Sequence, residues 1–206
     1  MGEVIALAEH RKRRKQRTGP PAGSSLRVHF HFDLACPFTY LAAERVERLI
    51  PTAVWIPTRG DLLPGRDAEA VRAEAQRRSG ELRLPLVWPD PPRADAAPVA
   101  MRVAAHAAEH GRGAGFALAA SRLAFCGGFA LDEPEVLAEA AAAAGIALED
   151  CLAAAGDASR DEPMEAAARN VLNLGADRLP CLIVGRAVFT GEERLAEAAA
   201  AARMPA

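Results

Sequence analysis

Hydrophobic and polar residues alternate along the segment VHFHF, residues 28–32. A period of two residues is typical of a β-strand, and we expect a strand over residues 27–32. After Pro37 the hydrophobic residues recur at helical spacing, which predicts a helix over residues 37–49. Proline is well tolerated at the first helical position, so Pro37 marks the start of this helix.

Four further patterns follow along the chain. A short strand is expected over residues 53–57, and an alanine-rich region with glycine and proline punctuation over 61–174 predicts several helices. Short hydrophobic runs typical of strands follow at residues 182–184 and 187–189. They are separated by Gly-Arg, which predicts a β-hairpin. A last helix is expected over residues 192–203.

The order of these elements predicts the fold. A strand, a helix and a second strand form a βαβ unit with a parallel strand pair, and the chain ends in ββα. This is the plan of an α/β thioredoxin fold with a helical domain inserted between its two halves. We expect a thioredoxin-like domain over residues 26–60 and 175–206, an inserted helical domain over 61–174, and a flexible basic arm over 1–25.

Charge and composition narrow the function classes. The arm carries six Lys/Arg against two Asp/Glu, and we read it as a solvated tail in preference to a contact for nucleic acid or membrane. The rest of the chain carries 19 basic against 25 acidic residues, so nucleic acid is not an expected partner. No apolar run is long enough to span a bilayer, and no secretory signal pattern is present, which favours a cytoplasmic protein.

One of the four cysteines has a distinctive position. Cys36 stands between the predicted strand and Pro37, at or next to the N-cap of the predicted helix. Free backbone N–H groups and the helix dipole there favour a thiolate, so we expect Cys36 to be the most acidic of the four thiols. The alternative is a small apolar residue that fills space at a helix start.

The segment FDLACPFTYLAAERV, residues 32–46, resembles the opening motif of the DsbA-like superfamily of thioredoxin folds. It is most similar to the branch that contains 2-hydroxychromene-2-carboxylate isomerases and kappa-class glutathione transferases, with Cys36 in place of the catalytic serine. The resemblance continues through WIP at 55–57 and ends with LPCLIVG and FTGEER, so it covers roughly residues 27–203.

The resemblance implies roles for the residues around Cys36. The disulfide oxidoreductases of the superfamily have a second cysteine where this chain has Thr39, so the usual dithiol–disulfide cycle within this motif is excluded. A mixed disulfide with glutathione or another small thiol remains open. Cys36 and Thr39 are the expected catalytic residues, and Pro37 and Phe38 are expected to line the binding site of the small thiol.

Two distant segments complete the implied site. Leu179-Pro180 resembles the superfamily's cis-proline loop, whose backbone pairs with a bound thiol. Glu192 and Glu193 lie in the turn that holds the γ-glutamyl end of glutathione in the relatives. Cys181 follows the proline, and a small buried strand residue is favoured there over a resolving cysteine for Cys36.

No metal or nucleotide cofactor is expected. His29 and His31 alternate on the first strand, and His106 and His110 stand four residues apart on a predicted helix, but no third ligand is apparent for either pair. Glu109 does not complete a metalloprotease motif. The expected cofactor is therefore glutathione or another low-molecular-weight thiol.

Three functions stay open. The first is a DsbA-like monothiol oxidoreductase or thiol transferase that acts through Cys36. The second is a thiol-dependent isomerase of the 2-hydroxychromene-2-carboxylate type, or a kappa-like glutathione transferase. The third is a catalytically degenerate binding protein of thioredoxin fold. The first two imply an enzyme with a small thiol and an unidentified second substrate as partners, and a homodimer is compatible with the superfamily.

Overall fold

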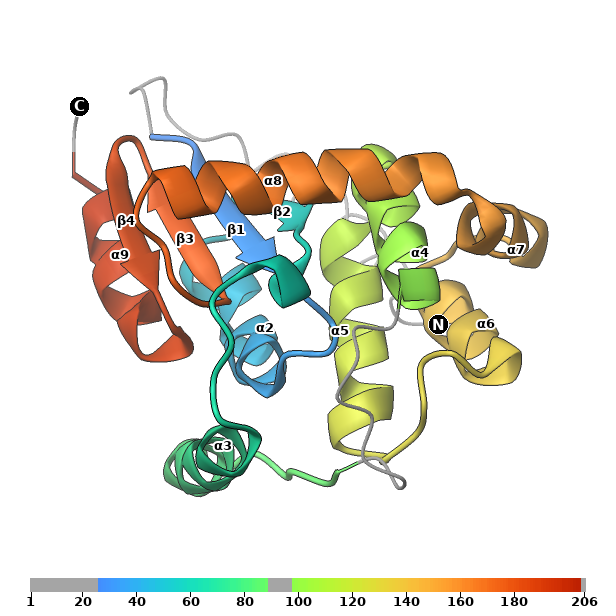
Figure 1. Ribbon diagram of the computed structural model, residues 1–206, viewed down its shortest axis with the longest axis horizontal. Coiled ribbons are helices and arrows are strands. Elements are labelled where there is room, and N and C mark those ends of the chain that lie inside the picture. The colour runs from blue at the N-terminus through green and yellow to red at the C-terminus, as the bar shows by residue number, and fades with distance from the viewer. Residues whose placement is uncertain (1–25, 89–97, 205–206) are drawn as a thin grey trace, which may run out of the picture.

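The computed structural model describes residues 26–88 and 98–204, so the expected arm lies outside the described residues. At its centre is a mixed sheet in the order β2-β1-β3-β4 (Figure 1). The strands are β1 (Val28–Phe32), β2 (Val54–Pro57), β3 (Cys181–Val184) and β4 (Ala187–Thr190). β1 pairs parallel with β2 and antiparallel with β3, and β3 pairs antiparallel with β4. The predicted βαβ unit and hairpin are confirmed.

Helices connect and cover the sheet. α2 (Pro37–Leu49) joins β1 to β2, and η3 (Glu192–Arg194) and α9 (Leu195–Ala202) follow β4. Between β2 and β3 come η1 (Gly60–Leu62), α3 (Ala68–Leu82), α4 (Pro98–Glu109), α5 (Gly113–Phe125), α6 (Pro134–Ala143), α7 (Leu148–Gly156), η2 (Ala158–Arg160) and α8 (Asp161–Asn173). The structure therefore confirms the predicted fold class, a thioredoxin fold with helices inserted between its two halves.

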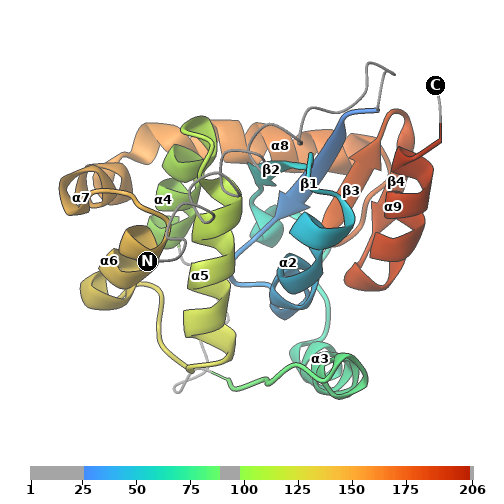
Figure 2. The ribbon, with the colours of Figure 1, turned by 180° about the vertical axis from the view of Figure 1, so that it is seen from behind.

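The two faces of the sheet have different covers. α2 lies on one face and α8 runs along the other, while α4 to α7 form a group to one side of the sheet (Figures 1 and 2). None of the described helices is long and apolar enough to cross a membrane. The sheet is thus enclosed between helices, as strands with two apolar faces require.

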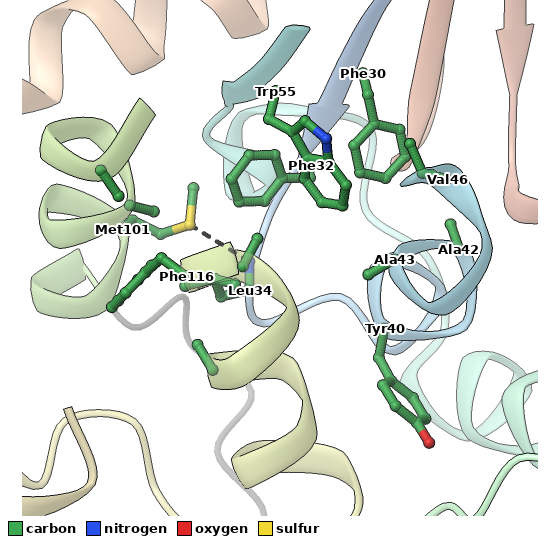
Figure 3. Packing of buried hydrophobic residues seen from close by; sticks show 14 of the residues in the cluster. Phe30, Phe32, Leu34, Tyr40, Ala42, Ala43, Val46, Trp55, Met101 and Phe116 are labelled. Carbon is green, nitrogen blue, oxygen red and sulfur yellow. Dashed lines mark hydrogen bonds between the residues drawn. The ribbon is translucent and has the colours of Figure 1, made fainter. Parts of the chain in front are cut away.

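Alternation along β1 produces two cores. Phe30 and Phe32 point to the α2 side, where they meet Trp55 of β2 with ring centroids 4.6 and 5.6 Å apart (Figure 3). Each such aromatic side chain contributes roughly 1.5–3 kcal/mol by leaving water. His31 points to the other face, opposite Cys181 of β3, where a smaller cluster packs beneath α8.

The last helix differs from the expectation. A continuous helix over residues 192–203 was the prediction, but residues 192–194 form one tight turn of 3₁₀ helix, η3. The N–H of Arg194 donates to the carbonyl of Gly191, three residues back, which tightens this turn. Gly191 has φ of +90°, a conformation that favours glycine.

Candidate active site

Cys36 occupies the N-cap of α2, as the sequence predicts. Its φ and ψ of −88° and 117° are extended, and Pro37 begins the helix. The N–H of Cys36 donates to the carbonyl of Asp33 at 3.1 Å, which closes the turn between β1 and α2. Met101 supports the same turn, because its sulfur accepts the N–H of Leu34 at 3.3 Å (Figure 3). As a whole residue, Cys36 is partly exposed at the end of the sheet.

A second loop meets Cys36 from the far end of the chain. The thiol donates to the carbonyl oxygen of Leu179, with Sγ 3.4 Å from the oxygen. The Leu179–Pro180 peptide bond is cis, and the carbonyl of Pro180 accepts the N–H of Gly191 at 2.8 Å. The structure thus brings together Cys36 and both residues of the expected proline loop.

The acidity of Cys36 differs from the expectation. Burial, together with the nearby charge of Asp33, raises its pKa to about 11. The backbone N–H groups of Thr39 and Phe38 and the Thr39 side chain oppose this rise but do not cancel it. The prediction of an acidic thiol is therefore wrong, because loss of solvent outweighs the helix N-terminus. The resting side chain is a protonated thiol, which suits its role as a donor to Leu179.

Asp33 is a site residue whose role the sequence analysis missed. Its side chain is only 2% exposed, and its carboxylate accepts the N–H groups of Ala35 at 2.8 Å and Gly60 at 2.7 Å. Burial raises the pKa of Asp33, and these two amides oppose the rise. A Cβ at Gly60 would lie 2.9 Å from the carboxylate, so glycine permits this close approach. The Phe-Asp pair of the motif was the available signal.

The remaining motif residues are buried. Thr39 is fully buried, and its hydroxyl accepts the N–H of Asp33 at 3.4 Å. Pro37 and Phe38 are buried in the first turn of α2, and the guanidinium of Arg66 lies 5.6 Å from the centre of the Phe38 ring. These residues form a rigid base beneath Cys36, with a cation above Phe38.

The two glutamates of the GEER turn have different environments. Glu192 is fully buried, and its carboxylate binds Arg45 of α2 and Arg78 of α3. The structure corrects the expected ligand role of Glu192, because a buried carboxylate with two arginine partners is held inside the fold. Glu193 is exposed and pairs with Arg178 at 2.5 Å.

The other cysteines lie apart from this chemistry. Cys181 is fully buried in β3, and burial raises its pKa to about 12. Cys151 is also buried, and burial raises its pKa. Cys126 is partly exposed, with its sulfur 3.0 Å from the hydroxyl of Tyr40. All four cysteines are free, and the thiol of Cys36 is the one that donates to the carbonyl of Leu179.

His31 lies behind the site in the core beneath α8. The hydroxyl of Thr58 donates to the carbonyl of Ile56, so it accepts from Nδ1 of His31 at 2.9 Å. Nε2 of His31 is buried without a hydrogen-bond partner among the described residues. Burial lowers the pKa of His31 to about 4, and the nearby His29 adds to this effect. The imidazole is therefore neutral at physiological pH.

Solved structures share this architecture. A 2-hydroxychromene-2-carboxylate isomerase matches with a TM-score of 0.67 at 15% identity, over 82% of this chain and 91% of its own. A probable DsbA oxidoreductase from Streptomyces coelicolor matches with a TM-score of 0.68 at 22% identity, over 88% and 92%. The cytosolic disulfide reductase DsbM from Pseudomonas aeruginosa matches with a TM-score of 0.65 at 20% identity, over 86% and 95%.

These identities show a shared fold and leave the reaction open. The same reductase has also been solved with GSH, and that structure matches with a TM-score of 0.60 at 20% identity, over 86% of this chain and 96% of its own. No curated protein matches the chain. The family model of the DSBA-like thioredoxin domain matches residues 27–202, which include the strand, the Cys36 turn, the inserted helices and the proline loop. The chain therefore belongs to the DSBA-like thioredoxin domain family.

Proposed function

We propose that this protein is a monothiol oxidoreductase or thiol transferase whose nucleophile is Cys36. The contact between Cys36 and Leu179 carries this proposal, because it places the thiol at a helix N-terminus against a backbone edge that suits an incoming thiol compound. Thr39 stands in place of a second cysteine and leaves the nucleophile without a partner in the motif. Glutathione or a similar thiol supplies the second sulfur.

The reaction has two exchanges. The Cys36 thiolate attacks one sulfur of a disulfide, a new S–S bond forms, and the other sulfur leaves as a thiolate that takes up a proton. The thiolate of a small thiol then attacks the substrate sulfur held on Cys36, releases Cys36 as a thiolate and leaves in a new disulfide with that sulfur. One sulfur of the original disulfide is thus released reduced, the small thiol is oxidised in its place, and Cys36 ends the cycle unchanged.

Activation of the thiol accompanies substrate binding. A pKa of about 11 leaves roughly one Cys36 in ten thousand as thiolate at pH 7. A bound disulfide that pairs with the backbone of Leu179 replaces the carbonyl as the neighbour of Sγ. Without that carbonyl beside the sulfur, the backbone N–H groups of Thr39 and Phe38, which lower the pKa of the thiol, favour the thiolate.

The charged pair beside Gly191 suits the end of a γ-glutamyl thiol. Glu193 is exposed and Arg178 is half-buried, and a guanidinium nitrogen of Arg178 lies 2.5 Å from a carboxylate oxygen of Glu193. An α-amino group complements the carboxylate of Glu193, and an α-carboxylate complements the guanidinium of Arg178. A cytoplasmic location, where small thiols are kept reduced, fits this assignment.

One observation favours a second function. A protonated Cys36 is an S–H donor, and an S–H donor can hydrogen-bond the sulfur of a bound glutathione as a serine does in the isomerase and transferase branch. The chain would then use the small thiol to isomerise an electrophilic substrate or to conjugate it. In this case Cys36 would form no covalent bond.

The test is incubation with oxidised glutathione, followed by intact mass spectrometry and peptide mapping. We expect one glutathionyl adduct on Cys36, no adduct on Cys36→Ser, and an unchanged adduct on Cys126→Ser. Cys126 is the matched control because it is the other partly exposed cysteine. A protein that stays unmodified refutes the monothiol reaction, and glutathione-dependent turnover that survives in Cys36→Ser supports the second function.

A further inference from the structure

Three side chains with metal-binding atoms meet at the end of α4. His106, Glu109 and His110 each offer one ligand atom, and these atoms all lie within 4.8 Å of one another. The helical path continues to His110, whose N–H donates to the carbonyl of His106 at 3.3 Å. Residues three and four apart therefore share one face of the helix here. The sequence analysis found no third ligand for this histidine pair, and the fold supplies Glu109.

The two imidazoles are arranged for a shared ligand. Their ring centroids lie 4.2 Å apart with a tilt of 37°. Nδ1 of His110 lies 2.8 Å from the carbonyl oxygen of His106, so Nδ1 carries the proton and donates. Nε2 of His110 consequently keeps its lone pair. A backbone carbonyl that fixes the tautomer of a ligating histidine is a common arrangement at metal sites.

The carboxylate of Glu109 is held in place from a separate element. Oε2 of Glu109 accepts a hydrogen bond from Arg160 of η2 at 2.7 Å. This contact occupies one oxygen and leaves Oε1 available as a ligand. Metal-binding carboxylates are commonly hydrogen-bonded in this way by a neighbouring donor.

The three-residue cluster also lies beside a groove in the surface. Glu109 contributes to the lining of an apolar groove of about 280 Å³ between α4, the edge strand β2 and α8. Val54, Ile56, Ala105, Ala108 and Met164 line the same groove. An ion bound by two imidazoles and one carboxylate keeps a position for water or a small ligand. The groove provides room for such a ligand beside the cluster.

We propose that His106, Glu109 and His110 form a binding site for a divalent transition-metal ion. Two imidazole nitrogens and a carboxylate oxygen suit Zn²⁺, and the same set accepts Cu²⁺ or Ni²⁺. Mg²⁺ and Ca²⁺ are disfavoured, because both prefer ligand sets made of oxygen. The site is separate from the thiol chemistry of Cys36 and does not depend on the function proposed above.

The test is a titration of the full-length protein, labelled with ¹⁵N in its histidines, with ZnCl₂ alone. We expect the ring nitrogen signals of His106 and His110 to shift together and to saturate at one Zn²⁺ per chain. The signals of His29 and His31 should stay in place, because their ring centroids lie 6.5 Å apart and no third ligand accompanies them among the described residues. These two histidines serve as internal controls.

Two variants sharpen the test. His110→Ala should abolish the zinc-induced shift of His106, and Glu109→Gln should weaken the apparent zinc affinity on the order of tenfold or more, a loss typical even for outer partners of metal ligands. Cys36→Ser should leave the histidine shifts intact, which separates this site from zinc bound to a thiol. Histidine signals that do not move with zinc, or that move equally in His110→Ala, would overturn the proposal.

Discussion

Sγ of Cys36 lies 3.4 Å from the carbonyl oxygen of Leu179, a residue 143 positions further along the chain. Only a protonated thiol can donate in this contact, and a thiolate would face a carbonyl dipole of the same sign. The fold therefore holds the Cys36 side chain in its protonated form. The reactivity of Cys36 therefore depends more on which group takes the place of the Leu179 carbonyl next to Sγ than on the helix N-terminus alone.

The alkylation rate of Cys36 should follow its raised pKa. The thiolate is the reactive form, so labelling by iodoacetamide should be slow at pH 7 and should still increase with pH above 9, because the pKa is about 11. Peptide mapping by mass spectrometry between pH 6 and pH 10 measures this profile, with Cys126 followed in the same samples. A plateau of Cys36 labelling near neutral pH would contradict the prediction.

Asp33→Asn should make Cys36 more acidic. The substitution removes a buried negative charge that raises the pKa of the thiol. We expect the alkylation profile of Cys36 to move to lower pH. Stability should fall by about 1–3 kcal/mol, because an amide side chain offers one oxygen to the two N–H groups of Ala35 and Gly60. Asp61→Asn, at an exposed neighbouring carboxylate, should leave the profile of Cys36 in place.

Acid should destabilise the protein through His31. Burial holds the pKa of His31 at about 4, whereas in the unfolded chain the imidazole takes up its proton near its ordinary pKa of 6.5. Between these values the unfolded state binds the extra proton, so the free energy of unfolding falls as the pH falls, by on the order of 3 kcal/mol in total. Urea unfolding of His31→Asn should show a flatter pH dependence over this window than the parent protein.

Asp33 contributes to the pH dependence of the free energy of unfolding with a sign opposite to that of His31. Its raised pKa means that the folded state holds this proton more tightly than the unfolded state, so its contribution is lost as the pH rises. The comparison of His31→Asn with the parent isolates the histidine, since both proteins keep Asp33. His29→Asn, at the half-buried neighbour on β1, is the matched variant. An identical pH dependence in His31→Asn and the parent would refute the assignment.

Glu192→Gln should be far more damaging than Glu193→Gln. The first removes a fully buried carboxylate and leaves Arg45 and Arg78 without their shared partner, a loss of about 3–5 kcal/mol for a buried pair. The exposed pair of Glu193 and Arg178 contributes only about 0–1 kcal/mol. Urea unfolding of the two adjacent variants gives the comparison. Equal losses of stability in the two variants would show that the burial of Glu192 does not make its ion pairs more stabilising than the pair of Glu193.

Thr39→Cys should restore the dithiol motif of the oxidoreductases. The new cysteine lies in the first turn of α2, three residues after Cys36, where the N–H of Thr39 already donates to the carbonyl of Cys36 at 3.0 Å. We expect an intramolecular disulfide after treatment with oxidised glutathione, in place of the glutathionyl adduct. Peptide mapping distinguishes the two products. An adduct that persists in the variant would mean that the two sulfurs cannot meet.

Local signals explain what the sequence predicted well. Pro37 begins α2 because its missing N–H costs nothing there, and the alternation of β1 matches its two differently covered faces. The position of Cys36 at the N-cap follows from these two neighbouring signals. The proline loop was recognisable only through a family resemblance, since Leu-Pro alone does not specify its place in a fold.

Contacts between distant segments explain what the sequence predicted poorly. An acidic Cys36 is the correct inference from the helix N-terminus alone, but burial against a loop 143 residues away reverses it. The GEER turn does not reveal which of its two glutamates turns inward, because Arg45 and Arg78 come from other helices. At the end of α4 the spacing of Glu109 between two histidines could be read from the sequence. It was set aside as a metal site because it does not match a metalloprotease motif.

Glu192 has a consequence for how the molecule can move. Its one carboxylate ties three segments together: α2, which follows Cys36, α3 at the start of the insertion, and the turn that follows β4. A hinge motion that swung α3 outward would separate Arg78 from this buried carboxylate, while Arg45 of α2 would stay beside it. Because a buried charge that loses a partner is costly, the shared carboxylate opposes an outward swing of α3.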